Sequence, residues 1–265
     1  MNVKELENKV ALVTGASRGI GRAISLALAQ EGAQLILAGR ELSALNETAR
    51  LITELKVGPS PFVCHMDLLD SSTIQNSVQL SLQAFGQIDI LVNNSGITGK
   101  LAPLWELDEA EWDDGIDTNL KGPFLLSKAI IPSMISRKSG SIIFIGSITG
   151  KRPLINRSVY AASKLGMVGM MRTLALELGR HGVRVNLISP GFVAGPRLDG
   201  VIAQVASQEK TTPEEMSAKW LEMIPTGRFI SPDDIAQGVL FFASNRSGAT
   251  TGEDLNISGG LVMYS

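Results

Sequence analysis

A tyrosine, a lysine and a serine have the spacing that a proton-transfer site would need. Tyr160 and Lys164 are four residues apart, and Ser147 follows the apolar run 142–145, thirteen residues before the tyrosine. On a helix, positions four apart share a face, so a phenol and an ammonium would lie side by side, facing the strand end that carries Ser147. An isolated tyrosine has a pKa of about 10, and a neighbouring cation favours its phenolate. The same spacing also occurs as plain surface decoration of a helix, so the surrounding elements decide its meaning.

Short apolar segments alternate with amphipathic ones along the chain, without a linker or a repeat. The strand candidates are residues 10–13, 34–38, 62–65, 88–92, 142–145, 183–188 and 255–257. The helix candidates are residues 21–30, 43–55, about 109–136, 159–180 and about 196–224, with a last helix starting at Pro232. We predict an α/β fold: a single domain with a doubly wound, Rossmann-type parallel sheet of about seven strands and helices on both faces.

The composition is that of an ordinary soluble globular protein. Hydrophobic residues make up 44% of the 265 residues and charged residues 19%, with a net charge of −2. This profile allows a large core and shows no basic excess for nucleic acid. No apolar stretch approaches the ~18 residues of a membrane span, and the first residues lack a signal pattern, so we expect a cytoplasmic protein without a membrane partner. One cysteine, Cys64, and two histidines leave no internal disulfide and no clustered metal site.

A glycine-rich segment follows the first strand candidate and opens the first helix candidate. It contains Gly15, Ser17, Arg18, Gly19, Ile20 and Gly21. Glycines at such a turn let backbone N–H groups approach a pyrophosphate, and the helix N-terminus adds partial positive charge. The spacing is Gly-x-x-x-Gly-x-Gly rather than the commoner Gly-x-Gly-x-x-Gly, and a glycine turn can also be a plain connection. Because a strand precedes it and a helix follows it, we predict a dinucleotide site.

The end of the second strand candidate indicates which dinucleotide binds. An NAD site usually has an Asp or Glu there for the ribose 2′-hydroxyl, whereas a 2′-phosphate needs cations. Here the residues are Gly39 and Arg40, and Arg18 of the glycine segment could hold the phosphate from the other side. We predict NADP(H) over NAD(H). The alternative is that both arginines are solvated surface residues, and Glu41 lies next to Arg40.

With these residues in place, the chain resembles the short-chain dehydrogenase/reductase family almost from end to end. The further motifs that carry the resemblance are Asp67-Leu68, Asn93-Asn94-Ser95-Gly96, Asn119 and Pro190-Gly191-Phe192-Val193. In that family the first motif contacts adenine, the last seats the nicotinamide, and the single asparagine is the fourth catalytic residue. The resemblance also implies that Asn94, Ser95 and Gly96 lie at the cofactor. Ser95 stands where the family usually has Ala, and Gly195 stands where its nicotinamide loop commonly has Thr.

The resemblance implies a mechanism as well. Ser147 would hydrogen-bond the substrate oxygen, and Tyr160 would exchange a proton with it while hydride moves to or from the nicotinamide. Lys164 would favour the phenolate and bind the hydroxyls of the nicotinamide ribose. Asn119 would hold a water that joins Lys164 to solvent. We therefore expect an NAD(P)(H)-dependent oxidoreductase that interconverts a carbonyl and a secondary alcohol.

The sequence defines the substrate less closely, because residues of about 195–228 would cover the pocket and such segments vary. Apolar candidates to line it are Leu154, Ile155, Val193, Leu198, Ile202 and Trp220. Candidates to meet an acidic substrate are Lys151, Arg152, Arg157 and Arg197. The chain looks most similar to 3-oxoacyl-acyl-carrier-protein reductases, and a small ketone is also possible. Open alternatives are a dehydrogenase of a sugar, steroid or other alcohol, an epimerase or dehydratase, and a non-catalytic nucleotide sensor.

Two kinds of protein partner follow from the resemblance. Lys138 and the pair Arg180-His181 fall near the places where such reductases dock acyl carrier protein. The helix candidate 159–180 also has small and apolar residues at too many positions for a helix with a wet face. Family members pair this helix with its own copy and with the preceding long helix, so we expect a homotetramer.

Overall fold

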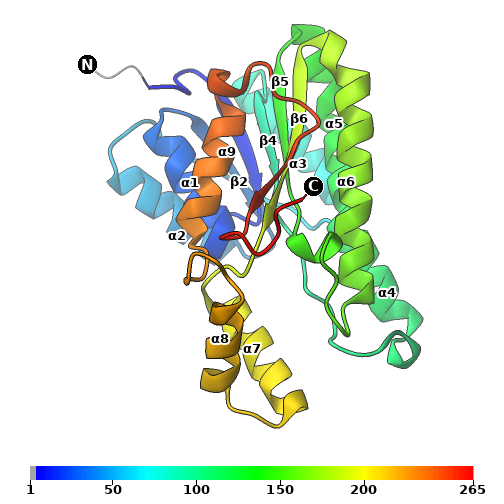
Figure 1. Ribbon diagram of the computed structural model, residues 1–265. Coiled ribbons are helices and arrows are strands. Elements are labelled where there is room, and N and C mark those ends of the chain that lie inside the picture. Colours follow the sequence, from blue (N-terminus) through cyan, green and yellow to red (C-terminus); the bar gives the residue numbers. More distant parts are fainter. Residues whose placement is uncertain (1–3, 265) are drawn as a thin grey trace.

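Seven apolar segments pair into one parallel sheet in the computed structural model of the protein, which describes residues 4–264. The strands lie in the order β3-β2-β1-β4-β5-β6-β7, and Figure 1 shows them at the centre of the molecule. Their bounds are β1 Val10–Thr14, β2 Gln34–Gly39, β3 Phe62–His65, β4 Ile90–Asn93, β5 Gly140–Ile145, β6 Val183–Pro190 and β7 Asp254–Ile257. Each predicted strand is present, and its ends lie within two residues of the prediction.

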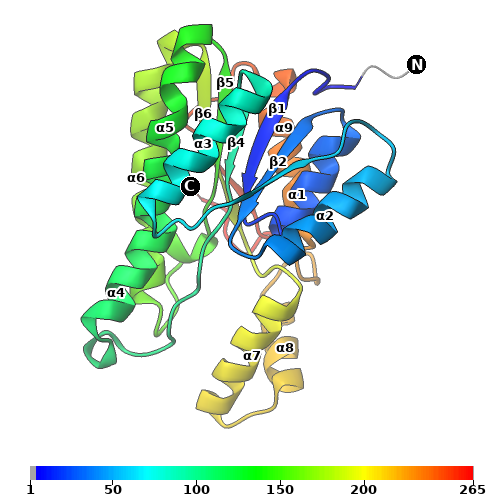
Figure 2. The ribbon, with the colours of Figure 1, turned by 180° about the vertical axis from the view of Figure 1, so that it is seen from behind.

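Both faces of the sheet are apolar, so both need a cover of helices. Successive side chains of a strand point to opposite faces. In β1, Ala11 and Val13 enter one buried cluster, whereas Val10 and Leu12 enter another. Figures 1 and 2 show the two helical layers from opposite sides. The first layer is α1 (Gly19–Gln30), α2 (Leu42–Glu54) and α9 (Pro232–Ala243), and the second is α3 (Ser71–Phe85), α5 (Gly122–Arg137) and α6 (Ser158–Leu178). The predicted single-domain, doubly wound fold is therefore confirmed.

Helix α3 was not among the helix candidates, although the strand–helix alternation requires one between β3 and β4. Its sequence is rich in serine and glutamine, which weakens the apolar periodicity that identifies a helix. Its ends carry clear signals instead. The carboxylate of Asp70 accepts a hydrogen bond from the backbone N–H of Ser72, and Gly86 ends the helix with φ of 71°.

The predicted long helix over residues 109–136 is divided into three parts. These are α4 (Glu109–Ile116), a π-helical turn η2 (Asp117–Lys121) and α5. Pro123 explains the irregularity, because it has no N–H to donate to the carbonyl of Asn119 four residues earlier. Such turns occur often at functional sites, and this one holds Asn119 with only 1% of its surface exposed.

Between β6 and α9 the chain forms two further helices, which project beyond the sheet in Figures 1 and 2. They are α7 (Pro196–Glu209) and α8 (Pro213–Glu222). They pack around a third apolar cluster in which the rings of Phe192 and Trp220 stack with centroids 4.5 Å apart. Among residues 4–264 there is no helix with the length and apolar character that crossing a bilayer requires.

The topology predicts where a ligand belongs. All strands are parallel, so their carboxyl ends meet at one edge of the sheet. Strand order reverses at β1, which pairs with both β2 and β4. In open α/β sheets, ligands bind in the crevice at such a reversal, beyond the carboxyl ends of the strands.

Candidate active site

The first turns of α6 and the end of β5 bring the tyrosine, lysine and serine together. Lys164 is 4% exposed, and its Nζ donates a hydrogen bond of 2.9 Å to the carbonyl of Ile145, the last residue of β5. The same Nζ lies 5.8 Å from the centre of the Tyr160 ring. Ser147 comes two residues after the strand, and its Oγ accepts a hydrogen bond from Thr149 N (3.1 Å). That bond leaves the hydroxyl proton of Ser147 as a donor.

Asn119 ties this cluster to the loop after β4. Its Oδ1 accepts a hydrogen bond from Ile97 N (2.8 Å), and its Nδ2 donates to Ile97 O (3.0 Å). Nδ2 also donates to Ser163 Oγ on α6 (3.1 Å). The π-helical turn thus joins the loop to the helix that carries Tyr160 and Lys164. The side-chain amide is engaged by protein groups in this arrangement.

The environment of Lys164 favours its neutral form. Burial lowers the pKa of this ammonium to about 7, and the positive charge of Arg197 adds to the effect. Gly96 keeps the loop close to the lysine, because a Cβ at this position would lie 2.9 Å from Asn119 Oδ1 and 3.5 Å from Lys164 Nζ. A lysine with this pKa can take up and release a proton near neutral pH, as a proton relay requires.

The glycine segment forms a cradle at the start of α1. Gly15 and Gly19 have φ of 63° and 54°, a region in which residues with a Cβ are strained. A Cβ on Gly21 would collide with the carbonyl oxygen of Gly15, whereas a Cβ on Gly19 would meet nothing within 4 Å among residues 4–264. No side chain of the described chain caps α1, and its first turn holds no acidic residue. The start of α1 therefore has backbone N–H groups without a side-chain cap, which suit a pyrophosphate.

Residues that the sequence analysis missed support this cradle. Arg22 donates to Ser17 O (2.6 Å) and to Thr48 Oγ1 (3.0 Å), and Thr48 Oγ1 in turn donates to Ala16 O (3.0 Å). Thr48 is fully buried in α2. A threonine on the apolar face of that helix was the feature of the sequence that could have predicted this contact. Asn94 braces the loop from the other side, since its Nδ2 donates to Thr14 O (2.8 Å).

The other predicted cofactor residues lie along the same edge of the sheet. Asp67 follows β3, its Oδ1 accepts a hydrogen bond from Leu69 N (3.0 Å), and Leu68 is buried. Arg18 and Arg40 are exposed and follow the neighbouring strands β1 and β2. Neither arginine forms an ion pair within residues 4–264.

The loop after β6 belongs to the same edge. Pro190 ends the strand, and Gly191 passes so close to the next segment that a Cβ would lie 2.8 Å from Ser258 Cα. Val193 forms a parallel bridge with Ile230, and Ala194 N donates to Ile230 O (2.8 Å). Backbone contacts thus hold the predicted nicotinamide loop in place, although Gly195 has no hydroxyl like that of the threonine common in the family.

Several expected pocket residues have other tasks. Lys151 is not available to an acidic substrate, because its Nζ forms a buried ion pair with Asp254 (2.8 Å). Arg152 contacts the sulfur of Met223 at 3.9 Å. Ile155 is 88% exposed. Three of the apolar candidates lie in the buried cluster of α7 and α8, which they hold together: Leu198, Ile202 and Trp220.

The cations expected to dock a carrier lie together, at the far end of α6. Lys138 ends α5, and a Cβ on Gly182, next to His181, would collide with the carbonyl oxygen of Lys138. Helix α6 has 21 residues and is therefore about 30 Å long. Lys138, Arg180 and His181 are separated from Tyr160 by almost this length.

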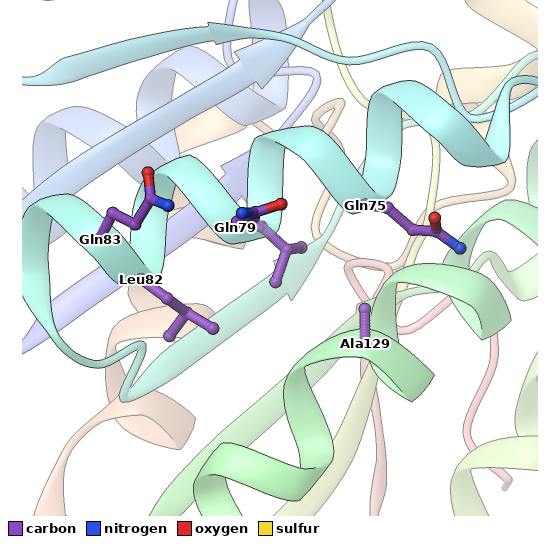
Figure 3. A pocket seen from close by; sticks show the side chains of 6 residues that line it. Gln75, Gln79, Leu82, Gln83 and Ala129 are labelled. Carbon is purple, nitrogen blue, oxygen red and sulfur yellow. The ribbon is translucent and has the colours of Figure 1, made fainter.

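A groove between α3 and α5, shown in Figure 3, has a volume of about 450 Å³. Its walls consist of amide and aliphatic side chains, namely Gln75, Val78, Gln79, Leu82, Gln83 and Ala129. None of these groups titrates or binds metal readily, and none of them belongs to the cluster around Tyr160. Among residues 4–264 there is also no group of three or more acidic, histidine or cysteine side chains that could hold a metal ion.

Comparison with known proteins identifies the family. Residues 9–206 match the family model described as short chain dehydrogenase. The chain is 38% identical over 258 residues to the 3-oxoacyl-acyl-carrier-protein reductase FabG of Thermotoga maritima, covering 97% of this chain and 99% of the relative.

Solved structures are similar over the same extent. One is a variant of actinorhodin polyketide ketoreductase with NADPH, at 32% identity and a TM-score of 0.92, covering 97% of this chain and 98% of the other. Another is an NAD⁺-bound xylitol dehydrogenase, at 29% identity and a TM-score of 0.90, covering 97% and 100%. The family match, the shared fold and the order of the motifs lead to one assignment: this chain is an oxidoreductase that belongs to the short-chain dehydrogenase/reductase family.

Proposed function

We propose that the protein reduces a 3-oxoacyl thioester or a small ketone to the secondary alcohol with NADPH. The observation that supports this most is the meeting of Ser147, Tyr160 and Lys164 at the same sheet edge as the open glycine cradle. When bound, a nicotinamide would supply the hydride. One relative is named a 3-oxoacyl-acyl-carrier-protein reductase and one structural neighbour a polyketide ketoreductase. Both names describe the reduction of a carbonyl group.

In this proposal each residue of the cluster has its own task. The free O–H of Ser147 holds the substrate oxygen, and the phenol of Tyr160 donates the proton to it. Lys164 supplies positive charge beside the phenol and, with its pKa near neutrality, returns the proton. Asn119 keeps the loop at Gly96 and Ile97 in position and serves the proton relay.

We propose NADP(H) because positive charge, not a carboxylate, follows β2. The pair Arg18 and Arg40 would hold the 2′-phosphate, Asp67 and Leu68 the adenine, and the glycine cradle the pyrophosphate. Asn94, Ser95 and Gly96 would flank the riboses, and Pro190, Gly191 and Val193 the nicotinamide. NADPH and NAD⁺ both occur in the names of structural neighbours, so the discrimination depends on these local charges.

The proposed assembly is a cytoplasmic homotetramer that takes acyl groups from a carrier protein or as free small molecules. Leu165 and Leu176 on α6 support association, since they are 52% and 85% exposed. Helix α6 lies at the edge of the molecule in Figures 1 and 2. Because Lys138 and His181 lie almost a helix length from Tyr160, a carrier docked there would have to reach a distant site.

The test is a panel of β-ketoacyl thioesters, small diketones, sugars and steroids, followed by loss of NADPH and NADH absorbance in parallel. We expect turnover of a β-ketoacyl compound or small ketone with NADPH. An Arg40→Ala variant should raise KM for NADPH more than tenfold and leave KM for NADH nearly constant. Preference of the wild-type protein for the carbonyl group of a sugar or steroid, or for NADH, would contradict the proposal.

A further inference from the structure

A buried arginine lies beside the proposed proton donor. Arg157 is 7% exposed, and its guanidinium carbon lies 5.7 Å from the centre of the Tyr160 ring. Its Nη1 donates one hydrogen bond, to Thr98 O (3.1 Å). A guanidinium has five N–H donors, so most of its donors have no acceptor within residues 4–264.

A second arginine reaches the same loop from α7. Arg197 Nη2 donates to Gly96 O (2.8 Å), across 101 positions of sequence. Gly96 and Thr98 are two residues apart, so the two acceptor carbonyls lie within about 7 Å of each other. Arg157 and Arg197 therefore converge on one short loop. Arg157 lies beside the Tyr160 ring, and the charge of Arg197 acts on Lys164.

These cations have no negative partner in the protein. Within residues 4–264, neither arginine nor Lys164 forms an ion pair with a carboxylate. The acceptors of all three are backbone carbonyls. Arg157 is buried, and a buried charge is normally paired. A guanidinium with free donors is suited to a carboxylate or phosphate, which it can bind through two parallel hydrogen bonds.

We propose that Arg157 and Arg197 form an anion site for the substrate, so that the enzyme prefers a small carbonyl compound with its own carboxylate or phosphate over a neutral thioester or ester. This inference rests on the proposed function and narrows its substrate class. The cofactor phosphates do not fill this role, because their cradle is at Gly19, whereas Arg157 and Arg197 are held at the loop of Gly96 and Thr98. The alternative is a structural role, in which the two arginines hold α6 and α7 against the loop. The experiment distinguishes this role from substrate binding.

The test compares matched substrate pairs with NADPH: 3-oxobutanoate against its methyl ester, and dihydroxyacetone phosphate against dihydroxyacetone. The readout is the ratio of kcat/KM for the charged member to that for the neutral member. In the wild-type protein this ratio should exceed ten for one of the pairs, and the preferred pair identifies the anion. Arg157→Gln and Arg197→Gln should each lower it at least tenfold, mainly through KM, while Arg157→Lys should retain part of it.

Controls distinguish the ways in which the inference can fail. Arg152→Gln removes a positive charge from the segment that precedes α6, five residues before Arg157, and should change the ratio less than threefold. If Arg157→Gln does not fold, the exposed Arg197→Gln still tests the site. If the arginine variants lose kcat/KM equally for charged and neutral substrates, the arginines have a structural or tuning role and the anion site is overturned. Weaker NADPH binding with an unchanged ratio would overturn it as well. Absence of NADPH oxidation with any carbonyl compound would instead refute the proposed function.

Discussion

At the scale of single residues, two basic side chains lie near the ring of Tyr160: Lys164 Nζ is 5.8 Å and the guanidinium carbon of Arg157 is 5.7 Å from its centre. Neither forms an ion pair with a carboxylate within residues 4–264. In the proposed reaction the phenol donates its proton to a carbonyl oxygen. The chemistry depends on one oxygen atom, which can be removed without changing the shape of the ring.

Tyr160→Phe should therefore fold and bind NADPH normally but lose turnover. General acid catalysis contributes about 10²–10⁴-fold, so kcat should fall within that range while the Kd for NADPH stays within threefold. Steady-state rates and cofactor fluorescence measure the two quantities. Tyr264→Phe is the matched control, because the only other tyrosine is 60% exposed. Near-normal kcat in Tyr160→Phe would remove the phenol from the mechanism.

Lys164 should oppose folding at low pH. Its pKa is lowered to about 7 in the folded protein but stays near 10.4 in the unfolded chain. Below pH 7 the lysine is charged in both states, and burying the charge lowers the free energy of unfolding by its full amount. As pH rises toward 10 the folded protein releases this proton first, and the loss of stability disappears. Relative to Lys164→Met, the wild-type free energy of unfolding should thus increase by about 2 to 3 kcal/mol between pH 6.5 and 9.

Urea unfolding of both proteins at the two pH values measures this difference. The variant should also be inactive, because the residue that costs stability is the one that serves the proton transfer. A stability difference that does not change with pH would mean that the ammonium remains charged throughout this range.

At the scale of elements, the turn between β1 and α1 needs glycine at two positions for two different reasons. At Gly21 the backbone of Gly15 passes too close for any Cβ, so the requirement is one of packing. At Gly19 the space is open, and the requirement comes from φ and from the anion that would approach there. The two positions should therefore respond differently to the same substitution.

Gly21→Ala should be poorly folded, since the added methyl group collides with backbone. Gly19→Ala should fold with a loss of about 1 kcal/mol for its left-handed φ, but its Kd for NADPH should rise more than tenfold. Thermal unfolding and calorimetric titration distinguish the two cases. A Gly19→Ala variant that binds NADPH normally would show that the pyrophosphate does not lie against this turn.

At the scale of the whole molecule, the outer side of α6 exposes two leucines beside polar residues such as Arg172 and Glu177. Leu165, Gly169 and Leu176 follow at spacings of four and seven residues and therefore lie on one side of the helix. In the proposed tetramer, Leu165 and Leu176 would be covered by another copy of the chain. The monomer as described leaves this face uncovered within residues 4–264.

The proposed tetramer of 28.2 kDa chains should elute with a mass of about 113 kDa in light scattering. Leu176→Glu should shift the population toward smaller species, because a carboxylate cannot be buried there without a partner. Leu80→Glu, which changes an exposed leucine of α3, should leave the mass unchanged. A wild-type mass of 28 kDa would refute the assembly.

The sequence by itself determined the order of the strands, the parallel sheet and most of the helices, and it predicted that Ser147, Tyr160 and Lys164 lie together. These depend on local periodicity and on the rule that parallel strands end at one edge, both of which act over short spans. It also indicated the glycine cradle, because the turn, strand and helix are contiguous in the chain.

Only the tertiary structure decided which charges are free. Lys151 and Arg157 looked alike in the sequence, yet Lys151 is paired with Asp254, more than a hundred residues away, whereas Arg157 has no carboxylate partner in the described chain. The brace of Arg22 and Thr48 and the π-helical turn at Asn119 likewise arise from contacts between distant segments. Burial and pairing depend on what packs against a side chain, and no local pattern contains that information.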